Sequence, residues 1–102
     1  MASKVYFTDL HTKHGHNLLT KFENLFKKAG IDELSFENKF TAIKIHFGET
    51  GNLAYIRPNY TKVLSDYIRS KKGRPFLTDC NTLYPGSRKN ALEHLDTAYQ
   101  NG

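Results

Sequence analysis

The sequence predicts an α/β fold, a three-layer β-α-β-α-β-α arrangement with a short, mainly parallel sheet. Short apolar runs alternate along the chain with longer stretches whose apolar residues recur at helical spacing. Strands that alternate with helices favour a parallel sheet with right-handed crossovers. Because three strands make a thin sheet and parallel sheets need both faces covered, we expect an incomplete half of a larger α/β domain.

Each element has a local signal. A first strand is expected over "KVYFTD", residues 4–9, and Asn17 can cap the helix that follows, with Gly30 as its stop. "FTAIKIHF" is the second strand, and Pro58 suits the first turn of a second helix, which Gly73 ends. "RPFLTDC" is the third strand. Ser87 can cap a third helix, which carries the apolar stripe Ala91, Leu92, Leu95, Ala98 and Tyr99.

Length and composition indicate one domain over residues 1–102. The net charge of +5 suggests a nucleic-acid partner, but clustered cations such as Lys27, Lys28 and Arg69 end predicted helices, where they offset the helix dipole. A nucleic-acid partner is therefore not expected. No apolar run approaches the ~20 residues that span a bilayer, and the first residues lack a signal-peptide pattern. The single Cys80 excludes an internal disulfide. We therefore expect a cytoplasmic protein with no membrane partner.

Polar residues follow the predicted strands. In an open α/β sheet, ligands bind beyond the carboxyl ends of the strands. The loop "HFGETGN" has two glycines that permit φ > 0 and expose backbone N–H groups, as phosphate-binding loops do. An anion between Arg57 and Arg88 would suit the helix N-termini beside them; alternatively, both arginines reach solvent or pair with a carboxylate. The candidate ligand-binding residues are Gly48, Gly51, Asn52, Arg57, Asp79, Asn81, Thr82 and Arg88.

A second hypothesis is an enzyme site. His46 and Glu49 could form an acid–base pair, Cys80 could be a nucleophile beside His46, and His46 is the candidate metal ligand. The structural alternatives are a hydrogen-bonding histidine, a surface glutamate and a small buried cysteine. "HTKHGH" lacks zinc-site spacing and is interpreted as a polar loop. A third hypothesis is a scaffold that completes its sheet with a partner, including a homo-oligomer.

Three long phrases carry a family resemblance: "SKVYFTDL", "AIKIHFGETGNLAYIRPNY" and "FLTDCNTLYPGSRKNALEHLDTAYQNG". They closely resemble the N-terminal part of the uncharacterised iron–sulfur-centre proteins, domain-of-unknown-function family 362. The resemblance implies an α/β domain that continues into a C-terminal ferredoxin-like module with two four-iron clusters. A cluster needs about four cysteine thiolates, so with only Cys80 we expect no cofactor in this chain and 4Fe–4S clusters only in the missing module.

The resemblance leaves the family's chemistry unassigned, so no catalytic role transfers. With the residues, it implies a ligand-binding domain of an iron–sulfur redox protein. Its crevice at the carboxyl ends of the strands would hold an anionic or metal-bound ligand. The expected partners are an anionic small molecule or the missing C-terminal half.

Overall fold

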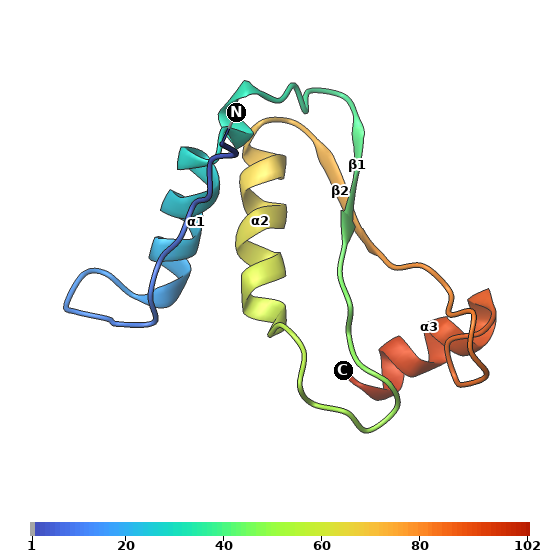
Figure 1. Ribbon diagram of the computed structural model, residues 1–102. Coiled ribbons are helices and arrows are strands. Elements are labelled where there is room, and N and C mark those ends of the chain that lie inside the picture. Colours follow the sequence, from blue (N-terminus) through green and yellow to red (C-terminus); the bar gives the residue numbers. More distant parts are fainter. Residues whose placement is uncertain (1) are drawn as a thin grey trace. The chain divides into compact units, whose positions relative to one another are not determined.

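Residues 2–102 are described by a computed structural model, and they form three helices and a two-stranded sheet (Figure 1). The α/β class and the parallel sheet are confirmed. No helix in this part of the chain is long and apolar enough to cross a membrane. The elements are α1 (Leu18–Lys28), the 3₁₀ turn η1 (Ile31–Glu33), β1 (Phe40–Lys44), α2 (Pro58–Ser70), β2 (Arg74–Thr78) and α3 (Ala91–Gln100).

Internal contacts divide the chain into two compact units. The first unit comprises the residues up to Thr41 together with Pro58–Pro75, and the second comprises Ala42–Arg57 and Phe76–Gly102. Each strand contributes residues to both units. The prediction of a single domain stays a prediction, and the units are described one at a time.

The first unit is built on the packing of α1 against α2. The Asn17 side chain caps α1 as predicted, accepting a hydrogen bond from the Thr20 N–H at 3.0 Å. Aromatic rings interlock edge to face between the helices, Phe22 with Tyr60 at 5.5 Å and Phe26 with Tyr67 at 5.1 Å between centroids. Such pairs stabilise the contact beyond the apolar area that they bury.

The end of α2 is fixed by one buried tyrosine and one glycine. The Tyr67 hydroxyl donates a hydrogen bond to the Asp32 carboxylate in η1, which raises the pKa of Tyr67 to about 12. The Gly73 N–H donates to the Ile68 carbonyl at 2.9 Å. A Cβ at Gly73 would lie 2.6 Å from the buried Ile68 side chain, so the predicted stop at this position needs a residue without one.

The two strands run in the same direction. Arg74 N–H donates to the Lys39 carbonyl and Ile45 N–H to the Thr78 carbonyl, both at 2.9 Å, so sequence numbers rise together along the pair. Ile43 is the buried residue of β1. The observed strands are shorter than predicted at their carboxyl ends, where the chain turns into the loops of the second unit.

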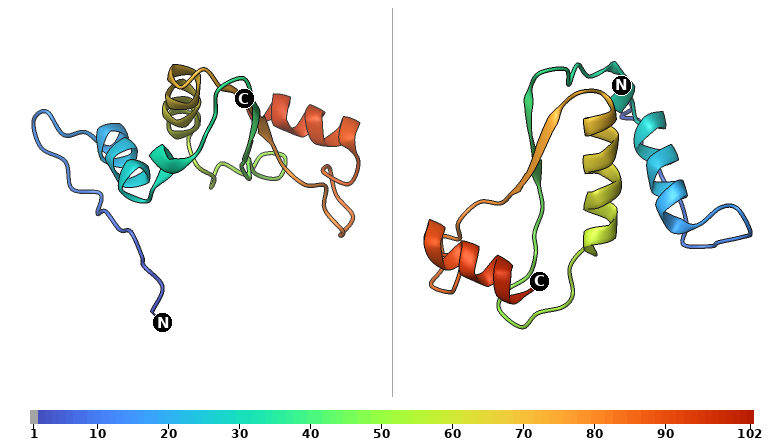
Figure 2. Two further views of the ribbon diagram at one scale, coloured as in Figure 1. Left: turned by 90° about the horizontal axis from the view of Figure 1, so that it is seen from above. Right: turned by 180° about the vertical axis from the view of Figure 1, so that it is seen from behind.

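The predicted strand over residues 4–9 is wrong. This segment has neither helix nor strand and runs as an extended trace (Figure 2), with Val5 and Phe7 exposed. An ion pair between Asp9 and Lys21 connects this segment to α1 within the first unit. A β-strand needs a neighbour to satisfy its backbone groups, and no strand pairs with this segment in the part of the chain that is described.

The third helix begins later than predicted, and its polar side rather than its apolar side faces the rest of the second unit. Its cap is Asn90, whose side chain accepts from the Glu93 N–H at 3.1 Å, and Ser87 is not the cap. The residues that α3 buries are His94 and Thr97, both polar. Its apolar stripe, with Leu92, Leu95 and Tyr99, is exposed. An apolar stripe usually faces a core; here hydrogen bonds to loops of the second unit hold the polar side inward.

Candidate functional site

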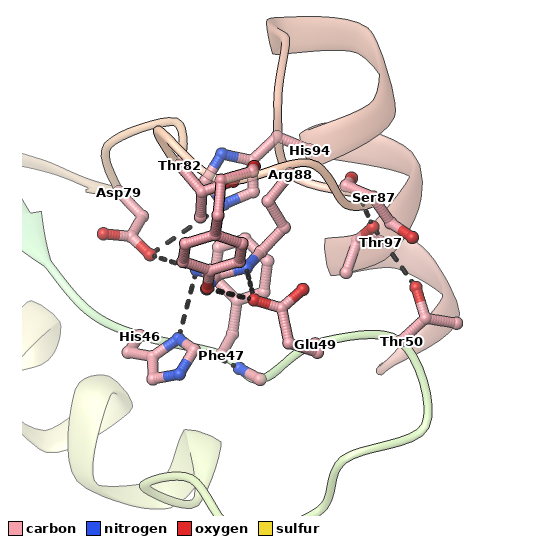
Figure 3. Close-up of polar contacts among 12 residues, drawn as sticks. His46, Phe47, Glu49, Thr50, Asp79, Thr82, Ser87, Arg88, His94 and Thr97 are labelled. Atoms are coloured by element: carbon pink, nitrogen blue, oxygen red, sulfur yellow. Dashed lines mark hydrogen bonds and ion pairs between the residues drawn. The ribbon is translucent and has the colours of Figure 1, made fainter.

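Arg88 is the centre of a polar network at the carboxyl ends of the strands, within the second unit (Figure 3). Its side chain is only 6% exposed. Nε, at 2.9 Å, and Nη2 donate to Glu49 Oε1, and Nη1 donates to Asp79 Oδ2 at 3.2 Å. Of the two interpretations offered for Arg88, the structure therefore shows pairing with carboxylates.

Glu49 is held as an anion by two donors. The Tyr84 hydroxyl donates to Glu49 Oε1 at 2.6 Å and also accepts from Arg88 Nη2 at 2.9 Å. The hydrogen bonds from Arg88 and Tyr84 hold the pKa of Glu49 below its usual range, although partial burial opposes this. The same contact with Glu49 raises the pKa of Arg88. At neutral pH this pair is a fixed ion pair rather than a proton-transfer group.

Asp79 lies directly after β2 and has a nearly buried side chain, 5% exposed. Lys44 Nζ, at the end of β1, donates to its Oδ1 at 2.9 Å, and the Cys80 N–H donates to the same oxygen at 2.8 Å. Burial raises the pKa of the Asp79 carboxyl, but the hydrogen bonds from Lys44 and Cys80 outweigh burial and leave the pKa below its usual value. The bond to Asp79 also raises the pKa of Lys44.

His46 accepts hydrogen bonds at Nδ1. Arg88 Nη1 lies 3.2 Å from this nitrogen, and the Gly48 N–H lies 3.4 Å from it. A guanidinium and a backbone amide can only donate, so Nδ1 carries no proton. The ring proton must therefore sit on Nε2, so the remaining ring nitrogen of this exposed residue is an N–H donor.

One asparagine organises the loop over residues 47–52. Asn101 Nδ2 donates to the carbonyls of Phe47 at 3.0 Å and Glu49 at 2.9 Å, while its Oδ1 accepts from the Gly51 N–H at 3.1 Å. Gly48 is buried with φ +84°, and a Cβ there would lie 2.6 Å from the Asn52 carbonyl oxygen. The N–H groups of both glycines are thus engaged within the protein.

A hollow of about 570 Å³ lies beside the network in the second unit. It runs along the end of β1 and the segment before α2, and its polar groups are a lysine, a histidine and a tyrosine. Tyr55 donates its hydroxyl to the Asn101 carbonyl at 2.6 Å, which fixes its ring in the wall. The lining residues are Lys44, Ile45, His46, Ala54, Tyr55 and Ile56.

Comparison with known proteins places this segment in a family. Residues 41–102 match the family described as "Domain of unknown function (DUF362)". The chain belongs to the DUF362 family. The matched segment contains Arg88 with all of its partners, and it excludes α1. No curated protein and no solved structure matches the chain.

The DUF362 segment brings four predicted site residues into direct contact: His46, Glu49, Asp79 and Arg88. Cys80 joins them through its backbone N–H, and no hydrogen bond links its exposed thiol to His46 within residues 2–102. Arg57 is exposed and makes no ion pair with any described residue.

The remaining predicted residues support the site from outside. Asn52 accepts from the Ala54 N–H at 2.8 Å, which shapes the wall of the hollow. Asn81 Oδ1 contacts His94 Nδ1 at 2.9 Å. The Thr82 N–H donates to the Arg88 carbonyl at 2.9 Å, which closes the loop between β2 and α3 around residues 82–88.

Sequence reasoning missed several members of the site. Lys44 could have been found, because it shares a strand face with His46 and precedes the same loop. His94 was missed because the apolar stripe of α3 suggested the opposite face as the inner one. Its Nε2 is buried without a hydrogen-bond partner, 3.8 Å from Asp79 Oδ2. For the hydrogen bonds of Tyr84 and Asn101 no sequence signal exists.

Metal-ligand chemistry finds little support in the described residues. They contain no group of three or more His, Cys, Asp or Glu side chains that could hold a metal ion. The histidines of "HTKHGH" lie in a tight turn closed by the His16 N–H, which donates to the Lys13 carbonyl at 2.9 Å. One cysteine does not match the donor set of an iron–sulfur cluster.

Proposed function

We propose that this DUF362 chain is a ligand-binding domain that binds a small anionic molecule in the hollow beside Lys44 and His46. The observation that carries the proposal is the hydrogen bonding of His46. Arg88 and Gly48 both donate to Nδ1, so Nε2 is the N–H donor of an exposed histidine that lines the hollow. A donor fixed in this way suits a carboxylate or a phosphate oxygen.

Lys44 supplies the charge. Its ammonium group binds Asp79 Oδ1 with one N–H, and its side chain remains 65% exposed, so further N–H donors stay accessible. None of the described residues that line the hollow carries a carboxylate. Ile45, Ala54 and Ile56 provide an apolar wall. A ligand with a small anionic head and an apolar or planar body matches this combination of groups.

Arg88 acts in this proposal as a positioning residue. Its guanidinium hydrogen-bonds Glu49 and Asp79 and its side chain is buried, whereas the Lys44 side chain is largely exposed, so Arg88 holds His46 rather than touching the ligand. The proposed ligand is still an anion bound beyond the carboxyl ends of the strands, but Lys44 rather than Arg88 is the cation that binds it. Arg57 directly follows Ile56 of the lining and remains a candidate second cation.

The same hydrogen bonds argue against a metal-bound ligand on His46. A metal-ligating histidine normally donates its other ring N–H to a carboxylate or a carbonyl. In His46 the other nitrogen faces two donors instead, so Nε2 carries the proton and has no free lone pair. The anionic form of the proposed ligand is therefore favoured.

The redox part of the proposal rests on the family resemblance alone. In a longer protein with iron–sulfur clusters, a ligand held in this hollow would exchange electrons with them. The enzyme hypothesis with His46, Glu49 and Cys80 gains no specific support, because Glu49 forms an ion pair with Arg88 and no hydrogen bond within residues 2–102 links the Cys80 thiol to His46.

A thermal-shift screen tests the proposal. The probes are inorganic phosphate, succinate, benzoate and a nucleoside monophosphate, each measured on the wild type and on Lys44→Ala, His46→Ala and Lys89→Ala. Lys89 is an exposed lysine outside the hollow and serves as the matched control. An anion at ~100 times its dissociation constant adds about 2.7 kcal/mol to the free energy of unfolding.

We expect one anion class to raise the melting temperature of the wild type and the Lys89→Ala variant, but not of the other two. A shift that survives both Lys44→Ala and His46→Ala would place the ligand elsewhere. No shift with any anion at saturating concentration would refute anion binding. Long-range ¹H–¹⁵N spectra of His46 test the geometry separately, and a proton found on Nδ1 would remove the argument.

A further inference from the structure

The outward side of α3 is an apolar surface on a helix whose inward side is polar. Thr97, 2% exposed, donates its hydroxyl to the Ser87 carbonyl at 2.8 Å, and His94 is held by Asn81. These bonds fix which side of the helix faces the second unit. The opposite side carries the outward stripe, which we define as Leu92, Leu95 and Tyr99, exposed by 75%, 67% and 88%.

Rotating α3 cannot bury the outward stripe. A half-turn would break the hydrogen bonds of Thr97 and His94 and would leave the polar side facing outward. Several large apolar side chains exposed on one helix face are a feature of surfaces that bind another protein. Two exposed carboxylates, Glu93 and Asp96, stand beside the stripe and make no ion pair within residues 2–102. The partner surface should therefore be apolar with cations at its edge.

The first unit offers a surface of that kind. The Phe40 ring is 70% exposed, and the Arg74 guanidinium lies over it, 4.4 Å from the ring centroid. Arg74 makes no ion pair with any described residue, and Lys39 beside Phe40 is exposed. A carboxylate near Arg74 and an aliphatic side chain on the Phe40 ring would complement the charge and the apolar surface together.

We propose that the outward stripe of α3 docks on the Phe40–Arg74 surface of a second copy of this chain. Leu95 and Tyr99 would pack on the Phe40 ring while Asp96 pairs with Arg74. In the proposed assembly each copy would give its helix to the other, so that two such contacts would close a dimer. Stripe-to-stripe pairing of two α3 helices is disfavoured because it brings the carboxylates of both copies together.

Sedimentation analysis of three variants tests this contact. Leu95→Glu alters the stripe, Phe40→Glu alters the receiving surface, and Leu83→Glu is the matched control on a fully exposed leucine outside both surfaces. We expect the wild type and the control to associate with rising concentration, with dissociation constants within about twofold. Leu95→Glu and Phe40→Glu should each weaken association by at least about tenfold. Far-UV circular dichroism checks that every variant is folded.

Mixing the two weakened variants distinguishes the proposed contact from other dimers. The Leu95→Glu chain keeps its Phe40 surface and the Phe40→Glu chain keeps its stripe, so the mixture retains one intact contact. We expect the mixture to associate more tightly than either variant alone. A wild-type chain that stays monomeric at every concentration overturns the proposal, and so does a wild-type dimer whose two variants do not complement each other.

Discussion

Replacing Arg88 with methionine tests whether the buried guanidinium holds the second unit together. Methionine keeps much of the side-chain volume and removes every N–H donor. Asp79, 5% exposed, and the Nδ1 atom of His46 would lose their hydrogen bonds to Arg88, and Glu49 would lose two. The nearly buried carboxylate would then rely on Lys44 and the Cys80 N–H.

The expected cost follows from these contacts. Removing one partner of a buried ion pair costs roughly 3–5 kcal/mol because the other charge is left uncompensated. Since Lys44 still pairs with Asp79, we expect the lower end, about 3 kcal/mol. With a denaturant slope of about 1.5 kcal/mol per molar urea, the unfolding midpoint should fall by about 2 M.

Urea unfolding followed by circular dichroism measures the effect, and a double-mutant cycle identifies its origin. Asp79→Asn removes the charge that Arg88→Met strands, so the double variant should be more stable than the sum of the two single changes predicts. Glu49→Gln is the matched comparison, and its coupling to Arg88 should be weaker because the Glu49 side chain is 38% exposed. A cost below about 1 kcal/mol, or simple additivity with Asp79→Asn, would contradict the reasoning.

Three further predictions concern stability. Gly48→Ala should destabilise by at least about 3 kcal/mol, because the left-handed φ of +84° is strained for alanine and its Cβ would meet a carbonyl oxygen at 2.6 Å. Gly51→Ala, with φ +81° and open space, should cost only about 1–2 kcal/mol, and equal costs in urea unfolding would refute this account. Because the folded-state pKa values of Asp79 and Glu49 lie below the ordinary 3.8 and 4.5, their contribution should hold from neutral pH down to about pH 4.5 and be lost as pH falls further; stability unchanged down to pH 3 would contradict it. Tyr67 has its pKa raised to about 12 from 10.0, so its contribution should be complete below pH 10 and be lost as pH rises towards 12. Ultraviolet titration of tyrosinate against Tyr67→Phe measures this, and a Tyr67 that ionises with the exposed tyrosines would show that its hydrogen bond is absent.

Local signals in the sequence predicted the elements that depend on local chemistry. Asn17 caps α1 and Pro58 is the first residue of α2, because a capping side chain and a fixed φ act within one turn of the chain. The second and third predicted strands are β1 and β2 of the structure. Their apolar runs stand on either side of α2, which is long enough to connect two parallel strands. These strands also place His46 and Asp79 after their carboxyl ends, and the structure brings both residues to Arg88.

Local patterns were insufficient where an element needs a distant partner. Residues 4–9 have the composition of a strand, but no strand pairs with them in the described chain. The apolar stripe of α3 predicted the inner face, whereas the bonds of His94 and Thr97 to loops of the second unit placed that stripe outside.

The contacts of Arg88 show the difference between what the sequence predicts and what only the tertiary structure decides. The sequence by itself determined the family, the α/β order and the gathering of polar residues after the strands, because each rests on phrases and periodicities along the chain. Only the tertiary structure decided that Arg88 is buried against Glu49 and Asp79, and that it leaves His46 as an N–H donor beside Lys44. Those contacts join residues up to 42 positions apart, and the direction of a side chain across such a separation depends on packing and desolvation rather than on neighbours in sequence.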